Sequence, residues 1–216
     1  MNIPTLQQAE AYLAEAETLN PGPWTDHSRH AAIAAAAIAQ CHPELDPGTA
    51  YILGLLHDIG RREGITDMRH ALDGYNFMLG EGYPDAARIC MTHSFPIPKI
   101  EAFAGGWGHC SEADLDFVRR YLAEVEFTPY DRLIQLCDTL ALPSGTCLME
   151  KRFVDVVMRY GFNDYTLEKW RAFIAIQQEF DAAIGRSIYS VLPGVVENSF
   201  AGGVIGRHFA GGGGGE

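Results

Sequence analysis

The sequence is poor in positive charge. Of its 216 residues, 16 are Lys or Arg and 28 are Asp or Glu, so the formal net charge is −12. Duplex nucleic acids and acidic membrane surfaces bind proteins through a cationic surface, which this composition does not provide. We therefore expect neither duplex nucleic acid nor a membrane as a partner. A small anionic substrate is still compatible with this charge, because a bound cation can reverse the sign inside one pocket.

Long apolar runs and cysteine pairs are also missing. The most apolar stretches, 31–39 and 51–56, are too short to cross a bilayer, and residues 1–10 lack the basic and apolar regions of a signal peptide. The five cysteines are an odd number, and none forms a C-x-x-C pair. Neither a disulfide framework nor a zinc knuckle is expected from this spacing. These absences predict a cytoplasmic protein with reduced thiols.

Strand signals are nearly absent, and the hydrophobic pattern is helical almost throughout. Apolar residues recur at three- and four-residue steps between Pro and Gly breaks, and Ser or Thr caps precede several of the runs. This pattern predicts helices at about 6–19, 25–40, 47–59, 68–81, 84–93, 112–123, 129–141, 150–160 and 166–192.

The predicted helices follow one another without an internal repeat. We predict an all-α fold, with one helical-bundle domain over residues 1–200 that includes C-terminal helices at 148–192. Residues 201–216 contain 8 of the 23 glycines, which predicts a flexible tail.

Histidine and aspartate residues stand at the ends and in the interiors of these helices. His27 lies near the start of the second predicted helix, and His57-Asp58 follows an apolar run thirty residues later. A buried helix that carries an imidazole and a carboxylate is costly unless a metal ion or another partner satisfies them. The same holds for Asp138 inside its apolar helix. Several such groups from separate helices can converge in a bundle core as a metal site with N and O ligands.

This pattern resembles the HD-domain superfamily of metal-dependent phosphohydrolases. Members have a His at the start of one helix, an adjacent His-Asp pair about thirty residues later, often within His-Asp-Ile-Gly, and a distant Asp. The resemblance covers about residues 25–143 and implies a helical bundle of the HD-domain type. It also implies that His27, His57, Asp58 and Asp138 hold one metal ion.

Two more histidines, His70 and His93, lie between the His-Asp pair and the final Asp. They occupy the places that mark members resembling two-metal enzymes, which implies a second ion at these histidines, with Asp58 as the bridge. If both histidines have ordinary surface roles, the protein is a one-metal member. His30 rivals His27 because it lies one turn along the same helix, but His27 matches the family position. Mixed imidazole and carboxylate ligands suit Fe, Mn, Ni, Co or Zn better than Ca.

Phosphate binding requires positive charge in addition to the metal ions. Arg61 and Arg62 directly follow the His-Asp-Ile-Gly turn and are candidates for bidentate contacts with a phosphoryl group. Lys99 and the Lys151-Arg152 pair are weaker candidates. Asp58 and Arg61 are the predicted catalytic residues. The expected activity is the hydrolysis, by metal-activated water, of a phosphomonoester or phosphoanhydride of a small molecule such as a nucleotide.

Two other functions are compatible with the same residues. A di-iron HD-fold oxygenase would share the six ligands, and a non-catalytic nucleotide-binding module would use the metal only for stability or sensing. The sequence also leaves two interpretations of the last long helix, 166–192. It can form a lid over the site or the interface of a homo-oligomer.

Overall fold

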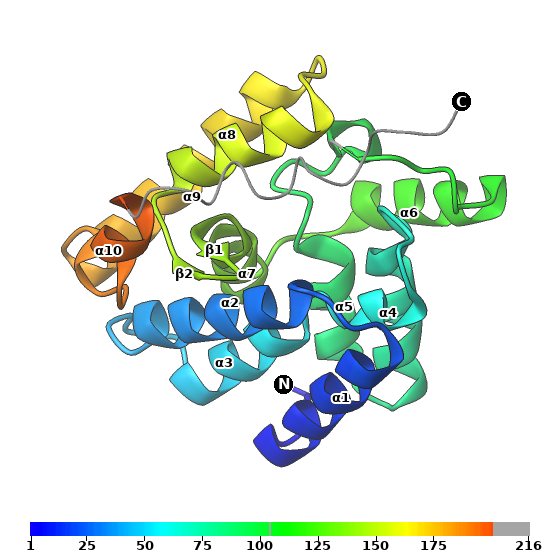
Figure 1. The fold of residues 1–216 in the computed structure, drawn as a ribbon, viewed down its shortest axis with the longest axis horizontal. Coiled ribbons are helices and arrows are strands. Elements are labelled where there is room, and N and C mark those ends of the chain that lie inside the picture. The colour runs from blue at the N-terminus through cyan, green and yellow to red at the C-terminus, as the bar shows by residue number, and fades with distance from the viewer. Residues whose placement is uncertain (104, 201–216) are drawn as a thin grey trace.

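Apart from two short strands, the regular secondary structure of the described residues is helical, as the periodicity predicts (Figure 1). The computed structural model describes residues 1–103 and 105–200, so the predicted glycine-rich tail, 201–216, lies outside the described residues. The elements are α1 (Leu6–Leu19), α2 (Trp24–Ala39), α3 (Pro47–Leu56), η1 (Ile59–Glu63), α4 (Arg69–Gly80), α5 (Pro84–Thr92), η2 (Ile100–Ala102), α6 (Glu112–Glu124), α7 (Pro129–Leu140), β1 (Ala141–Leu142), β2 (Gly145–Thr146), α8 (Met149–Tyr160), α9 (Thr166–Ile184), η3 (Ile188–Ser190) and α10 (Val195–Phe200). The η elements are short 3-10 helices, and the strands form one antiparallel pair.

The helix starts agree with the predicted ones to within one residue because the start signals are local. Thr5, Ser111 and Thr128 each accept a hydrogen bond from the amide three residues further on, which completes capping boxes at α1, α6 and α7. Proline in the first turn begins α3, α5 and α7, where its fixed φ suits the helix and its missing N–H costs nothing.

Two predicted helix ends are wrong. The helix expected to reach Ile59 ends at Leu56, and the chain continues through a turn into η1. The helix expected to reach Leu192 ends at Ile184, where Gly185 takes a left-handed conformation with φ 71°. The apolar residues after this glycine belong to η3 and α10 instead of to one continuous helix.

Helices α2 and α3 pack closely, with α7 next to them (Figure 1). A Cβ atom added at Gly54 of α3 would lie only 2.7 Å from the Cα of Ala32 in α2, so the two backbones nearly touch. A short connection joins the helices, which places the start of α2 beside the end of α3. Two of the candidate ligands, His27 and His57, lie at these neighbouring ends.

The remaining helices surround this pair. Helices α4 and α5 lie on one side of it, and α8 and α9 cross above it in the view of Figure 1. The main core draws buried apolar residues from most of the helices, and a smaller cluster around Phe95 joins the α4–α6 region. In the described part of the chain, no helix has both the length and the apolar character that a membrane span requires.

Candidate metal centre

The structure brings all six predicted metal ligands to one centre. They come from separate elements: His27 from α2, His57 and Asp58 from the turn after α3, His70 from α4, His93 from the end of α5, and Asp138 from α7. Five of the six are buried, and Asp138 keeps 21% of its side-chain surface exposed. A bundle core therefore holds four imidazoles and two carboxylates whose burial would be costly without a shared partner.

One half of the centre consists of His27, His57 and Asp138. The Nε2 atom of His27 lies 3.0 Å from Oδ1 of Asp138 and 3.2 Å from Nε2 of His57. The Nε2 atom of His57 is 3.9 Å from the same carboxylate oxygen. Because these ligand atoms all lie within 4.8 Å of one another, the group can hold one metal ion.

The other half lies around Asp58. Its Oδ1 atom is 3.1 Å from Nε2 of His70 and 3.4 Å from Nε2 of His93, and these two nitrogens are 3.3 Å apart. Its Oδ2 atom is 3.9 Å from Nε2 of His57. His57, Asp58 and His93 form a second group of ligand atoms close enough to share an ion. Asp58 thus faces both halves of the centre, one oxygen toward each.

The four histidine rings have the same orientation relative to the centre. In each ring, Nδ1 donates a hydrogen bond to a backbone carbonyl, and Nε2 points inward. The acceptors are the carbonyl oxygens of Ala141 for His27 (3.2 Å), Gly54 for His57 (2.7 Å), Asp67 for His70 and Cys90 for His93 (2.8 Å). Because a carbonyl can only accept, each Nδ1 carries the proton and each Nε2 lone pair is available to a metal ion.

The donor set fits divalent transition metals. Oδ1 of Asp58 is buried and receives no hydrogen bond from any described residue. The nearest nitrogens, in His70 and His93, have their protons on the opposite side of the ring. A buried carboxylate oxygen that faces only lone pairs is unfavourable, and a cation between them removes the cost. Imidazole nitrogen and carboxylate oxygen are ligands that such ions accept.

Arg61 brings a positive charge to this centre. Its Nε donates to Oδ2 of Asp58 at 2.6 Å, three residues along the η1 turn. Burial by itself raises the pKa of Asp58, but the positive charge of Arg61 is the strongest opposing cause, and the pKa lies well below its usual range. Asp58 is therefore ionised and ready to bind a metal ion at neutral pH.

We expect the metal-free protein to lose stability as the pH falls from about 6.5 to 4. Burial lowers the pKa of His57 to about 4, against the partial opposition of Asp58. An unfolded His titrates near pH 6.5, so the unfolded chain binds an extra proton in this interval and unfolding becomes more favourable. His70, with a lowered pKa, acts in the same direction, and His93, with a raised pKa, opposes it. The lowered pKa of Asp58 affects the stability only at still lower pH.

Urea unfolding of chelator-treated protein at pH 7 and pH 5 measures this loss. Between pH 7 and pH 5, His57 alone should lower the free energy of unfolding by about 2 kcal/mol. The His57→Asn variant removes the titrating group and should show a flatter pH profile. Equal free energies of unfolding for the unmodified chain at both pH values would contradict the prediction.

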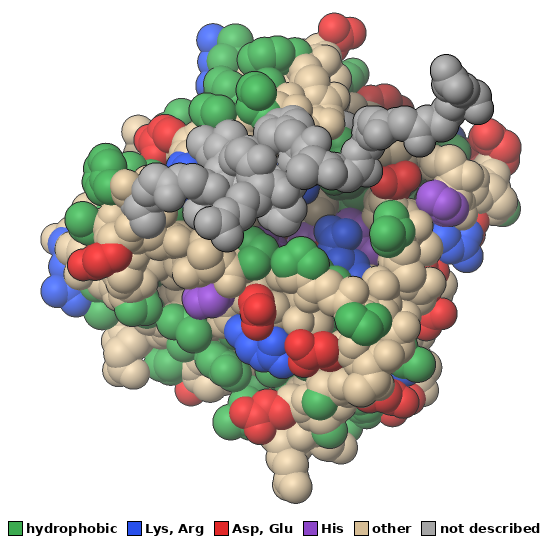
Figure 2. Space-filling view, viewed as in Figure 1, with side chains coloured by type: hydrophobic (Ala, Val, Ile, Leu, Met, Phe, Trp, Pro, Cys, Tyr) green, Lys and Arg blue, Asp and Glu red, His purple; other side chains and the backbone are tan. Residues whose placement is uncertain are grey.

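A cavity of about 420 Å³ opens onto the centre. Figure 2 shows histidine and cationic side chains together at the bottom of a hollow in this face of the molecule. Five of the six candidate ligands line the cavity with Arg61, and Trp24 of α2 lines it too. Its α8–α9 wall contains Arg152, Phe153, Asp155, Arg159, Tyr160, Lys169, Trp170 and Phe173.

Arg61, Arg62 and Lys99, which the sequence offers for substrate binding, lie in three different environments. Arg61 lines the cavity. Arg62 turns away, with its guanidinium 4.0 Å from the ring centre of Phe77 and a 3.1 Å hydrogen bond to Glu15. Lys99 pairs at 3.3 Å with Glu168 on the surface. Arg62 and Lys99 are therefore not in position to contact a molecule in the cavity.

The structure also distinguishes between the two histidines of α2. Nδ1 of His30 lies 2.9 Å from the carbonyl oxygen of Asp26, one turn back in its own helix, and the side chain is outside the centre. His27 is the α2 histidine whose ring meets His57.

Sequence reasoning missed a buried carboxylate that positions the centre. Asp131 of α7 accepts hydrogen bonds from Arg88 (2.8 Å) and Thr92 (2.6 Å) of α5 and from the Thr128 hydroxyl (2.6 Å). These bonds join α5 to α7, which carry His93 and Asp138. Its sequence signal, a capping box after Thr-Pro, predicts the helix start but not the partners on α5.

Among the residues of α8 and α9 that line the cavity, the sequence offered only Arg152 as a candidate, and the others were not predicted. Their apolar and cationic side chains recur at helical spacing, as in many surface helices, and the sequence does not say which face meets the cavity. Arg152 and Arg159 both bond to Asp155. In the sequence, their spacing of three and four residues from Asp155 is that of ordinary ion pairs on a helix surface.

Comparison with known proteins agrees with the geometry. A family model described as HD domain matches residues 24–142, more than half of the chain. No curated protein and no solved structure matches it. The matched segment contains all six converging side chains, whereas α8 and α9 lie beyond it. The chain therefore belongs to the HD-domain family, which binds divalent metals and is typical of metal-dependent hydrolases.

Proposed function

We propose that this protein hydrolyses a phosphomonoester or phosphoanhydride of a small molecule, and that its substrates are nucleotides. The observation that supports hydrolysis most is the joint placement of five of the six inward-facing ligands and Arg61 on one cavity. A centre that served only structure would not need an opening of this size or a guanidinium beside its bridging carboxylate.

We further propose two metal ions for this centre. His27, His57 and Asp138 would hold one ion, His70 and His93 the other, and Asp58 would bridge them, because its two oxygens face the two halves. Bound divalent ions supply a hydroxide nucleophile near neutral pH and neutralise charge on phosphoryl oxygens.

Arg61 would orient the phosphoryl group. Its Nε is occupied by Asp58, whereas its two Nη groups have no hydrogen-bond acceptor among the described residues. The side chain is about one-third exposed (36%) and lines the cavity. These two groups can donate to oxygens of a phosphate held beside Asp58, where charge-assisted bonds are strong.

The nucleotide assignment is supported by aromatic residues on the cavity walls. Trp24, Phe103, Phe153 and Trp170 line it together with the charged groups. Flat apolar rings beside a phosphate-binding centre suit a ligand that carries both a base and a phosphate.

Phosphate release by metal-reconstituted protein tests the proposed function. Chelated protein is reloaded with Mn, Co, Ni, Zn or anaerobic Fe, and nucleotides and simple phosphomonoesters are offered under argon and under air. We expect oxygen-independent phosphate release, with about two ions per chain by elemental analysis. The chelated half of the same preparation is the control and should release none.

The other outcomes would identify the alternatives. Oxygen uptake that requires iron, without phosphate release, would favour the di-iron oxygenase. Tight nucleotide binding without turnover would favour the binding module. About one ion per chain would remove His70 and His93 from the ligand set.

A further inference from the structure

Lys169 of α9 has unusual surroundings for a lysine. Its side chain lines the cavity and is partly buried. Its Nζ lies 6.0 Å from the ring centre of Phe103, and no carboxylate of the described residues pairs with it. Burial lowers the pKa of this ammonium group to about 8, although Asp138 acts in the opposite direction. An ammonium group taken out of water without an anion is unfavourable.

The neighbours of Lys169 cannot supply that anion. Glu168 faces the surface and pairs with Lys99. Asp138 faces the metal centre, with its Oδ1 3.0 Å from Nε2 of His27. Asp155, on the facing helix α8, accepts from both Arg152 and Arg159.

The α8–α9 wall is therefore cationic. Arg152, Arg159 and Lys169 carry three positive charges, and Asp155 is the one carboxylate among the wall residues that line the cavity. This excess stands in a chain whose net charge is −12. A local reversal of sign inside a cavity concentrates anionic ligands there.

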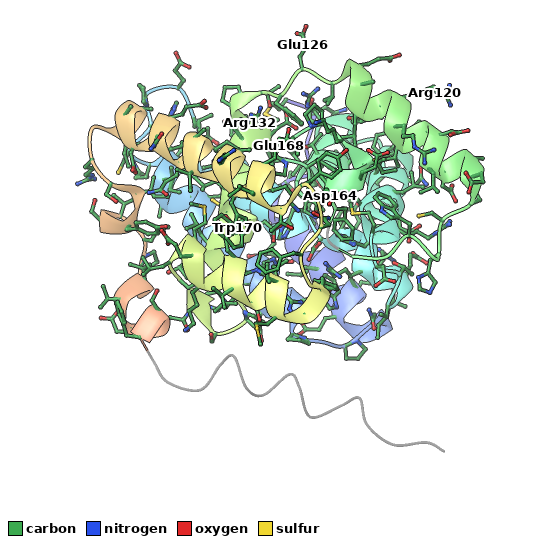
Figure 3. All side chains as sticks on the ribbon, turned by 90° about the horizontal axis from the view of Figure 1, so that it is seen from above. Arg120, Glu126, Arg132, Asp164, Glu168 and Trp170 are labelled. Atoms are coloured by element: carbon green, nitrogen blue, oxygen red, sulfur yellow. The ribbon has the colours of Figure 1, made fainter. Side chains whose placement is uncertain are left out.

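The packing of α9 against α8 holds Lys169 in place. Trp170, the next residue, lies between the two helices (Figure 3) and stacks on Phe153 with ring centres 5.2 Å apart and planes 3° from parallel. The wall thus has a rigid aromatic support, and Lys169 beside it faces the cavity.

We propose that Lys169 is a substrate-binding residue whose ammonium group contacts a phosphoryl oxygen of the molecule bound at the metal centre. This inference rests on the proposed function for the nature of the ligand. It assigns the substrate contact to a helix beyond the matched HD segment, 24–142.

Binding of inorganic phosphate to Mn-loaded protein, measured by titration calorimetry, tests the proposal. Lys169→Met should weaken binding about 10- to 100-fold, the usual effect of losing a charged hydrogen bond. Lys169→Arg, which keeps the charge, should recover most of the affinity. Lys99→Met is the matched control because it removes the same charge from an exposed ion pair nearby, and it should change the affinity less than about 3-fold.

The design separates this inference from the proposed function. If the unmodified enzyme hydrolyses nucleotides, Lys169→Met should raise KM by a similar factor and leave the metal content unchanged. Loss of phosphate affinity in a protein that hydrolyses nothing would support the anion site and contradict the hydrolase. Unchanged affinity in Lys169→Met and in a second neutral variant, Lys169→Gln, would overturn the inference, as would an unmodified protein that binds no phosphate.

Discussion

Replacement of Asp58 by Asn should abolish metal binding and phosphate release together. One oxygen of this carboxylate lies 3.1 Å from Nε2 of His70, and the other bonds to Arg61 at 2.6 Å. An amide keeps the shape of the side chain but removes the charge that both halves of the centre share. We expect the metal content to fall below one ion per chain. The rate should fall at least about 1000-fold, which corresponds to a loss of several kcal/mol of transition-state stabilisation.

Elemental analysis and phosphate release at saturating metal measure the two effects. The Asp26→Asn variant is the control, because it removes a carboxylate from the exposed face of α2. Circular dichroism must accompany both variants, since loss of one member of a buried ion pair can itself cost about 3–5 kcal/mol of stability. A folded Asp58→Asn protein that keeps its metal and turns over substrate would contradict the bridging assignment.

Replacement of Gly60 by Ala should destabilise the protein and disrupt the centre. An added Cβ would lie 1.9 Å from the carbonyl oxygen of His70 and 2.3 Å from the amide nitrogen of Gly74, both in the backbone of α4. No side-chain rotation can relieve such a clash, so η1 and α4 must move apart. We expect the free energy of unfolding to fall by at least about 3 kcal/mol, the upper end of ordinary overpacking.

The same movement should separate Asp58 from His70 and lower the metal content. Gly80→Ala is the matched control, because a Cβ there meets no atom within 4 Å and alanine favours the helix. Urea unfolding of both variants, with elemental analysis of the folded protein, measures the two effects. A Gly60→Ala protein as stable as the Gly80→Ala protein would contradict the packing argument.

For Gly60, the sequence gives a reason for the glycine, a helix end, that differs from the reason seen in the structure. Its place after an apolar run predicts a helix end, yet α3 ends four residues earlier, at Leu56. The structure assigns the glycine a different role, which is the near contact between η1 and α4. That contact joins residues ten to fourteen positions apart, and local propensity carries no information about it.

Arg61 and Arg62 show that the position of a residue in the sequence does not predict whether its side chain faces the site. Both follow the His-Asp-Ile-Gly turn, so the sequence treats them alike. The 3-10 geometry of η1 directs Arg61 back to Asp58, and the next residue therefore points toward α1 and Phe77. The direction of each guanidinium depends on elements that the sequence does not place.

The sequence by itself determined the helices up to α9 and their starts, and its resemblance to the HD-domain family supplied the six residues that converge. Caps, proline positions and the three- and four-residue period are local signals, and an imidazole or carboxylate in an apolar run implies a partner wherever the helix lies. Only the tertiary structure decided which cations face the cavity. Helical periodicity predicts which residues share a face of a helix, but not which other element that face packs against. Lys99 and Lys169 have the same chemistry, and the packing of α9 over the centre turns only Lys169 toward it.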